Sequence, residues 1–252
     1  MNFDLPFIPE RPEKPRESGL TMVMDKGLSI RGAENFCEVA SEYTDFVKLG
    51  FGTGLLTPGL KDKIKLYQEA GIKPYFGGTL FEAFIARDMF DDYRKFIADS
   101  GVETAEISDG VLPIIHEKKC QYITELAKEF QIFSEVGTKL KGKEISNQEW
   151  VSWMKTELEA GAWKVIAEAR ESGNMGIYNE DGSANSQLIM DIRKEIKTED
   201  ILWEAPLKSQ QVWFIKLLGP NVNLGNIAYS EVIALETLRR GLRGDTLLSF
   251  LP

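Results

Sequence analysis

The sequence predicts an α/β protein that forms a single (β/α)8 TIM barrel. The chain has 252 residues, close to the roughly 250 residues of a typical barrel of this kind. Eight short apolar runs alternate with eight segments whose apolar residues recur at helical spacing. An open doubly wound sheet would also alternate in this way, but it needs a glycine-rich dinucleotide turn after its first strand. Asp25-Lys26-Gly27 is not such a turn, so the count of eight favours the closed barrel.

Each predicted strand is a short apolar run that ends at a polar or glycine-containing corner, and each predicted helix follows such a corner. The strands are predicted at residues 20–24, 45–49, 73–76, 104–107, 131–136, 163–167, 201–204 and in the apolar run that ends at Gly225-Asn226. The helices are predicted at residues 32–43, 59–70, 81–99, 116–129, 147–160, 184–196, from Lys208 onward, and at 229–240. Pro206 ends the seventh strand and Gly71 suits the residue just after a helix.

The chain divides into an extended, Pro-rich N-terminal arm, residues 1–17, and a barrel catalytic domain, residues 18–252. The arm is acidic and has no basic segment followed by a long apolar one, so it is not expected to be a signal peptide. We expect it to lie over the floor of the barrel or over a neighbouring subunit. Its proline spacing leaves open a second role as a ligand for a partner protein.

Composition excludes several classes of function. The net charge is −9, whereas a nucleic-acid surface needs a basic face. The apolar runs are all shorter than the roughly 18 residues of a membrane helix. Cys37 and Cys120 are the only cysteines, which fits a reducing compartment, and we therefore expect a cytoplasmic protein without nucleic-acid or membrane partners.

Carboxylates recur at the carboxyl ends of the predicted strands, which all lie on one face of a parallel barrel. One such residue alone is most often a salt-bridged rim charge, but a whole ring of them suits a hard cation such as Mg²⁺, which takes oxygen ligands and keeps waters for a substrate to displace. The predicted metal ligands are Asp25, Glu106, Glu135, Glu168 and Glu204, chiefly Glu106, Glu135 and Glu168.

Cations and other polar groups share the same corners and suit an anionic substrate. An arginine there can grip a phosphate or sulfonate with two parallel hydrogen bonds, and a lysine can act as a general acid if its neighbours lower its pKa. The predicted substrate-binding residues are Lys26, Thr79, Arg170, Lys208, Asn223 and Asn226. Glycines after strands two and three are either plain turn residues or donors of open amides to an oxyanion. Residues 172–186, rich in Gly, Asn and Ser, are expected to form a mobile lid.

Other chemistries find little support in the sequence. His116 is the only histidine and is predicted near a helix start on the surface, so it is not expected to be the catalytic base. One histidine without a paired cysteine argues against a zinc site or a Ser-His-Asp arrangement. The sequence also contains no nucleotide-binding loop of the Gly-x-x-x-x-Gly-Lys-Ser/Thr type.

The corners resemble those of a known family over residues 18–246. The motifs that carry the resemblance are MDKGL (24–28), DFVK (45–48), GFGT (50–53), GGTLFE (77–82), EISDG (106–110), EVG (135–137) with Lys139, EARESG (168–173), EAPLKSQQ (204–211), NLGNI (223–227) and ETLRRGLRGDT (236–246). In this respect the chain resembles the phosphosulfolactate synthase family of coenzyme M biosynthesis, some of whose relatives are described only as heat-stress-associated proteins.

The resemblance implies a (β/α)8 barrel that adds sulfite to phosphoenolpyruvate, with Mg²⁺, to give (2R)-phospho-3-sulfolactate. It also implies that Lys139 is the proton donor, and the need to bring two anions together gives Lys48 and Arg170 catalytic roles as cations. Small anionic substrates are the expected partners, and a homo-oligomer is expected. Two alternatives stay open: a barrel enzyme acting on another phosphorylated enol acid, and a non-catalytic, stress-associated barrel.

Overall fold

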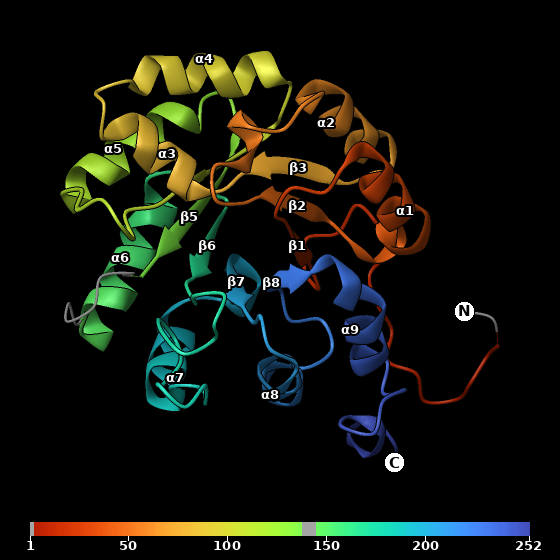
Figure 1. Ribbon diagram of the computed structural model, residues 1–252. Coiled ribbons are helices and arrows are strands. Elements are labelled where there is room, and N and C mark those ends of the chain that lie inside the picture. The colour runs from red at the N-terminus through yellow and green to blue at the C-terminus, as the bar shows by residue number, and fades with distance from the viewer. Residues whose placement is uncertain (1–2, 138–144) are drawn as a thin grey trace.

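The computed structural model of the chain describes residues 3–137 and 145–252. Within these ranges eight strands alternate with helices along the chain (Figure 1). The strands are β1 (Thr21–Asp25), β2 (Phe46–Leu49), β3 (Lys73–Phe76), β4 (Thr104–Ile107), β5 (Gln131–Val136), β6 (Lys164–Ala167), β7 (Ile201–Glu204) and β8 (Leu224–Ala228). The helices are α1 (Ile30–Ala40), α2 (Leu60–Glu69), α3 (Gly78–Ile85), α4 (Phe90–Ser100), α5 (His116–Leu126), α6 (Asn147–Glu159), α7 (Ser186–Glu195), α8 (Lys208–Leu218) and α9 (Val232–Arg239).

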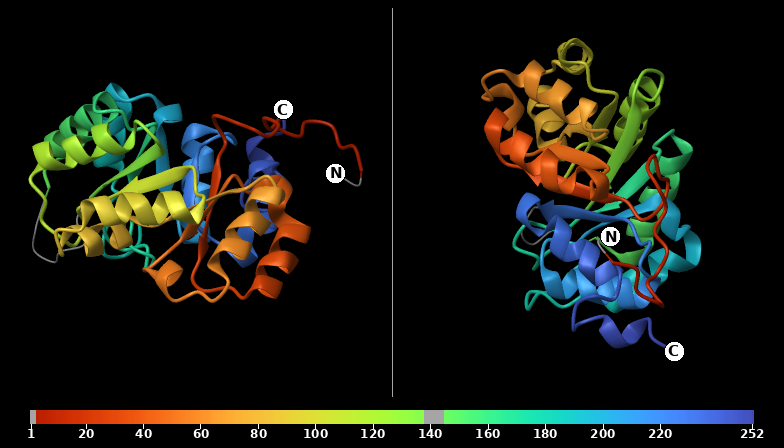
Figure 2. Two further views of the ribbon diagram at one scale, coloured as in Figure 1. Left: turned by 90° about the horizontal axis from the view of Figure 1, so that it is seen from above. Right: turned by 90° about the vertical axis from the view of Figure 1, so that its right-hand side faces the viewer.

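All strands run parallel in one sheet with the order β3-β2-β1-β8-β7-β6-β5-β4. The two strands at the ends of this order, β3 and β4, lie next to one another, which nearly closes the sheet into a barrel. The helices lie around the outside of the strands (Figures 1 and 2). The predicted (β/α)8 barrel is therefore confirmed. No helix in the described ranges is long and apolar enough to cross a bilayer.

One predicted helix is wrong. The segment predicted as a single helix at residues 81–99 forms two, α3 and α4. They are separated at Asp88, which has a φ of 55°, a left-handed conformation that aspartate tolerates better than most residues and that no helix continues through. Asp91 and Asp92 then stand in the first turn of α4, where carboxylates favour the positive end of a helix. The apolar pattern runs across this break and does not reveal it.

The barrel interior is filled by side chains, as in other barrels of this class. Its apolar layers are formed by Leu20, Met22, Met24, Phe46, Tyr75, Phe133, Ile166 and Leu202. Two residues further along three of these strands, the inward position carries a charge: Lys48 after Phe46, Glu135 after Phe133 and Glu204 after Leu202. Because side chains alternate between the two faces of a strand, the strands themselves carry these charges to the mouth of the barrel.

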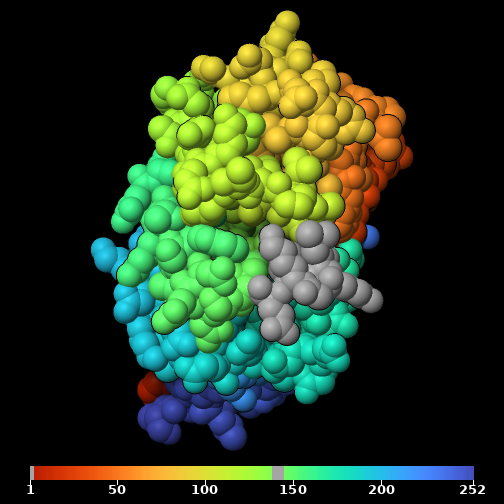
Figure 3. Space-filling view, turned by 90° about the vertical axis from the view of Figure 1, so that its left-hand side faces the viewer, coloured from red at the N-terminus to blue at the C-terminus, as the bar shows by residue number. Residues whose placement is uncertain are grey.

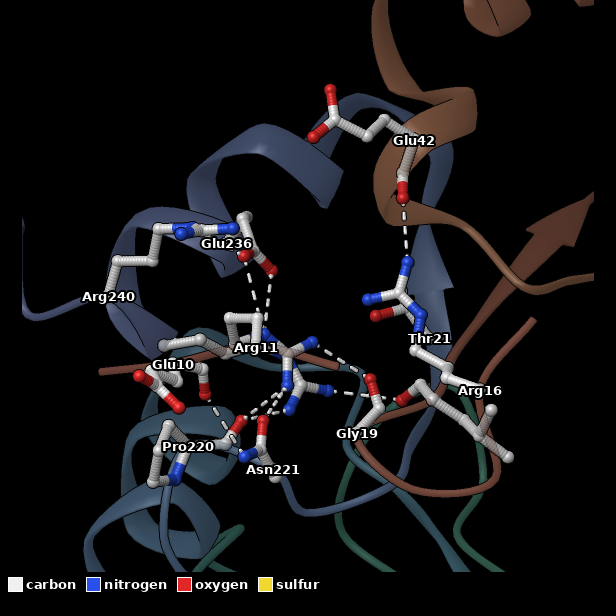
Figure 4. A network of polar contacts seen from close by, with 12 residues as sticks. Glu10, Arg11, Arg16, Gly19, Thr21, Glu42, Pro220, Asn221, Glu236 and Arg240 are labelled. Carbon is white, nitrogen blue, oxygen red and sulfur yellow. Dashed lines mark hydrogen bonds and ion pairs between the residues drawn. The ribbon is translucent and has the colours of Figure 1, made fainter. Parts of the chain in front are cut away.

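The N-terminal arm, described from residue 3, contacts the floor of the barrel, where the strands begin (Figure 4). Arg11 donates to the carbonyl oxygen of Pro220 at 3.0 Å and pairs with Glu236 of α9 at 3.3 Å. Arg16 pairs with Asp45 at 2.9 Å, and both of these side chains are buried. The arm therefore ties the start of the chain to residues near its end, at the face opposite the mouth.

Candidate functional site

A cavity of about 430 Å³ lies at the carboxyl ends of the strands. Residues at or just after the end of every one of the eight strands line it. Such a position is where barrels of this class carry their chemistry, because the loops that follow the strands converge there. The cavity is therefore the candidate active site.

Lys48 lies in this cavity, among three of the glutamates that line it. Its Nζ lies 2.9 Å from Glu106 Oε1, 3.3 Å from Glu204 Oε1 and 3.4 Å from Glu135 Oε2. All four side chains are buried, and all four line the cavity. Burial by itself would lower the pKa of Lys48, but the charges of Glu106, Glu204 and Glu135 outweigh it and hold that pKa well above its ordinary value. Lys48 is therefore a fixed cation at neutral pH.

Backbone amides hold two of these glutamates in place. The Gly78 N–H at the start of α3 donates to Glu106 Oε1 at 2.6 Å, and the Ala169 N–H donates to Glu204 Oε2 at 2.8 Å. Burial raises the pKa of Glu106, and Glu135 raises it further, while Lys48 opposes both effects. The positions of the carboxylates are thus set by the chain around them as well as by the lysine.

Three of the glycines after strands two and three, Gly50, Gly77 and Gly78, favour the turn interpretation. The amides of Gly50 and Gly77 already donate to the carbonyl oxygens of Asp25 and Leu49, each at 3.1 Å, and that of Gly78 donates to Glu106. A Cβ at residue 78 would lie only 2.4 Å from the Ser108 hydroxyl oxygen. Close packing under α3 therefore explains the glycine at position 78.

Glu82 has a structural task that the sequence did not assign to it. This buried side chain of α3 accepts a hydrogen bond from the Ser108 hydroxyl at 2.5 Å and from the amides of Val111, at 2.8 Å, and Leu112. It thereby fixes the loop after β4, of which Val111 lines the cavity. The position of Glu82 at the end of the GGTLFE motif was the only sequence signal.

Several predicted substrate-binding residues also line the cavity: Lys26, Thr79, Arg170 and Asn226. Lys26, after β1, forms an ion pair with Glu171, after β6, and both side chains are about half exposed. Asn226 in β8 has a φ of 56° and donates through Nδ2 to the Ala169 carbonyl oxygen at 3.2 Å. Lys26 and Arg170, from the loops after β1 and β6, therefore line the same cavity as Lys48.

Two predicted substrate-binding residues lie away from the cavity. Asn223 precedes β8, at the floor of the barrel, where its side chain accepts from the Leu20 amide at 3.0 Å and donates to the Ile201 carbonyl oxygen at 3.0 Å. Lys208, at the start of α8, pairs with Asp245 at 3.0 Å on the outer surface. Neither residue lines the cavity in the described part of the chain.

Two predicted metal ligands are also absent from the cavity lining formed by residues 3–137 and 145–252. Asp25 faces the helices, where its carboxylate pairs with Lys63 at 2.5 Å and accepts the Tyr67 hydroxyl at 2.9 Å. Glu168 is buried beside Gly137, at which a Cβ would lie 2.5 Å from Glu168 Oε2. Glu106, Glu135 and Glu204 remain as the predicted ligands that line the cavity.

No group of three or more acidic, histidine or cysteine side chains among the described residues has the arrangement of a preformed metal cage. Glu106, Glu135 and Glu204 converge on the Lys48 ammonium group instead. A donor set of carboxylates still suits Mg²⁺, because this ion commonly binds through one or two carboxylates and takes its other ligands from water and substrate. The residues present therefore fit a magnesium ion that is bound together with the substrate.

Lys139 lies outside the described residues. Its role as proton donor therefore stays a prediction.

The expected lid, residues 172–186, is hydrogen-bonded to the barrel near the middle of the segment. The Ile177 amide donates to the Glu168 carbonyl oxygen at 3.0 Å, and the Tyr178 hydroxyl donates to the Glu204 carbonyl oxygen at 2.7 Å. Of this segment, only Ser172 belongs to the cavity lining as the described residues form it.

Comparison with known proteins extends these observations. The family model for (2R)-phospho-3-sulfolactate synthase (ComA) matches residues 9–245. A phosphosulfolactate synthase from Methanothermobacter thermautotrophicus is 44% identical over 251 residues, which is 97% of each chain. Another from Bacillus subtilis is 42% identical over 243 residues, 95% of this chain and 96% of that protein. The protein HEAT-STRESS-ASSOCIATED 32 of Arabidopsis thaliana is 24% identical and covers 91% of this chain and 88% of its own.

A solved structure of 3-hexulose-6-phosphate synthase from Salmonella typhimurium has a TM-score of 0.54 at 16% identity and covers 91% of this chain and 99% of that one. That likeness concerns the barrel fold alone. The family model, in contrast, spans nearly the whole chain, including the corners that line the cavity. This chain is therefore a member of the (2R)-phospho-3-sulfolactate synthase family.

Proposed function

We propose that the protein is a lyase-type enzyme that joins sulfite to phosphoenolpyruvate and forms (2R)-phospho-3-sulfolactate. The observation that carries the proposal is the convergence of Lys48, Arg170 and Lys26 on one cavity in a chain of this family. Both proposed substrates are anions, and their mutual repulsion must be offset before a carbon–sulfur bond can form. Cations fixed by a rigid scaffold do this without reorganising during the reaction.

The surroundings of Lys48, Arg170 and Lys26 indicate a different role for each in the proposed reaction. Lys48 stays charged because three glutamates surround it, so its role is to stabilise negative charge as sulfite attacks C3 of phosphoenolpyruvate. Arg170 suits a phosphate or sulfonate group, which a guanidinium can bind with two parallel hydrogen bonds. Lys26 pairs with Glu171 only at the exposed rim, where such pairs are weak, so an incoming anion can displace the glutamate.

The final step is protonation of C2, which sets the configuration of the product. We assign the donor as Lys139 on the resemblance to the family. Lys48 suits this task poorly, because an ammonium group whose pKa is held high gives up its proton reluctantly. Glu106, Glu135 and Glu204 are the candidates to hold Mg²⁺ with the substrate. When bound, the ion would supply Lewis-acid stabilisation of the charge that develops on the substrate carboxylate.

Product analysis tests the proposed reaction. With phosphoenolpyruvate, sulfite and Mg²⁺ we expect one organic product that carries both a phosphate ester and a sulfonate, and no consumption of phosphoenolpyruvate when sulfite is omitted. Consumption without sulfite would indicate the alternative, an enzyme for another phosphorylated enol acid. No consumption under any of these conditions would favour the other alternative, a non-catalytic, stress-associated barrel.

Removal of divalent cations is expected to abolish turnover. After exhaustive chelation, Mg²⁺ or Mn²⁺ should restore activity better than Zn²⁺, because the candidate ligands are all carboxylate oxygens. The measurement is the initial rate as a function of added metal, with the buffer exchanged to remove the chelator. Full activity in the chelated enzyme would remove the metal from the proposal.

A homo-oligomeric state and a cytoplasmic location stay predictions from the sequence.

A further inference from the structure

Behind the cavity, a second lysine is buried in the layer between the strands and the helices. Lys119 comes from α5, its side chain is 1% exposed, and its counter-ion Glu157 of α6 is fully buried. The two helices lie side by side at the surface shown in Figure 3 and cover the pair. A buried ion pair contributes little to stability compared with apolar residues of the same size, so its presence calls for another explanation.

The contacts of Lys119 indicate what the pair does. The Nζ atom donates to Glu135 O at 2.7 Å and lies 2.8 Å from Glu157 Oε1 and 2.9 Å from Asp109 Oδ1. An ammonium group has three N–H donors, and here each can meet a partner from a different segment: the end of β5, helix α6 and the loop after β4. The lysine therefore joins three elements at one point.

The carbonyl oxygen of Glu135 needs such a partner because β5 extends beyond β4. The ladder between the two strands ends at the pair Ile107–Ser134, so the next residue of β5 has no strand beside it on that side. A buried carbonyl without a donor is costly, and the Lys119 ammonium group replaces the missing strand. One residue earlier, the Ser134 hydroxyl donates to Glu157 Oε2 at 2.6 Å. The pair thus binds two successive residues of β5.

We propose that Lys119, with Glu157 as its counter-ion, is a positioning residue that sets the place of the Glu135 carboxylate in the cavity. The same backbone unit that Lys119 binds carries the Glu135 side chain to Lys48, 3.4 Å away. Lys119 also holds Asp109, in the same loop whose Val111 amide donates to Glu82. As far as it concerns turnover, this inference rests on the proposed function.

The test is a double variant, Lys119→Met with Glu157→Gln. It removes the two fully buried charges together, and the glutamine can still accept from Ser134. Asp109 also loses its cation, but its side chain is 18% exposed and can bind water instead. We expect a folded protein whose kcat is lower by roughly tenfold or more, because small misplacements in an active site are costly. The KM for phosphoenolpyruvate should change by less than about threefold, since Lys26, Lys48 and Arg170 remain.

The matched control is Arg16→Met with Asp45→Asn, which removes a buried ion pair at the floor of the barrel. This control is expected to change thermal stability but not kcat. An equal loss of kcat in both double variants, or an unchanged kcat in the Lys119 variant, would overturn the proposal. A crystal structure of the Lys119 double variant gives a readout that does not need turnover: the Glu135–Lys48 contact should lengthen, and its retention would also overturn the proposal. An inactive wild-type enzyme would instead count against the proposed function.

Discussion

Replacement of Lys48 by methionine is expected to remove a large part of the stability of the protein at neutral pH and nearly all of its turnover. The variant leaves Glu106, Glu135 and Glu204 buried together without the cation that they share. Removing one partner of a buried ion pair typically costs about 3–5 kcal/mol. Turnover should fall roughly a hundredfold to a thousandfold, the scale seen when a fixed electrostatic contact to developing charge is lost.

The stability deficit of the Lys48→Met variant should depend on pH in a defined direction. Burial already raises the pKa of Glu106, and Lys48 opposes that rise, so the pKa should rise further in the variant. A carboxyl group with a raised pKa in the folded state favours folding below its unfolded pKa of about 4.3 and loses that contribution as pH rises through the folded pKa. The deficit should therefore be small near pH 5 and large near pH 8.

Thermal unfolding of wild type and variant at a series of pH values measures this deficit. The wild-type lysine does not titrate in this window, because its pKa is held well above the ordinary lysine value. Lys65→Met is the matched control, since Lys65 is 74% exposed and pairs only loosely with Glu69 at 3.6 Å; it should leave stability and turnover nearly unchanged. A deficit that is constant across pH would mean that the glutamates do not stay charged around Lys48.

The second large effect is expected from Lys139→Ala, which should reduce kcat by roughly a hundredfold or more, the usual scale of general acid catalysis. The affinity for phosphoenolpyruvate should change little, because Lys26, Lys48 and Arg170 still line the cavity. Lys139→Arg should not restore turnover, since a guanidinium does not release its proton near neutral pH. Steady-state kinetics of the two variants provide the measurement.

Lys141→Ala is the natural control for this prediction, as it removes a neighbouring lysine from the same stretch of sequence. It is expected to retain near-normal kcat. If Lys139→Ala were itself to turn over at nearly the wild-type rate, the proton donor would have to be another cation. Lys26 would then be the better candidate, because the glutamates around Lys48 keep its proton tightly held.

The fold was predictable because each strand and its polar corner can be recognised locally. The position of the three cavity glutamates also follows from local rules: Glu106, Glu135 and Glu204 lie within their strands, where alternation decides which way a side chain points. The same rule would have excluded Asp25, since Met22 and Met24 face the barrel interior and their neighbour must face outward.

Other placements depend on contacts that local rules do not reach. Glu168 follows the last residue of β6, so alternation no longer fixes its direction. Asn223 precedes β8 and therefore lies at the opposite end of the barrel from Asn226. Lys119 contacts Glu157 and the Glu135 carbonyl oxygen, which belong to another helix and to a strand. The spacing of these three residues along the chain does not predict the contacts.

The arm on the barrel floor has a consequence for synthesis of the protein. Arg11 pairs with Glu236, 225 residues later, and β1 pairs with β8. At a translation rate of about 5–20 residues per second, the ribosome adds Glu236 roughly ten to forty-five seconds after it has added Arg11. During this interval the first strand lacks one of its two neighbours and Arg11 lacks its partners Pro220 and Glu236, although the pair of Arg16 with Asp45 can already form. The nascent chain therefore offers an unpaired strand edge to chaperones until the last quarter of the protein has emerged.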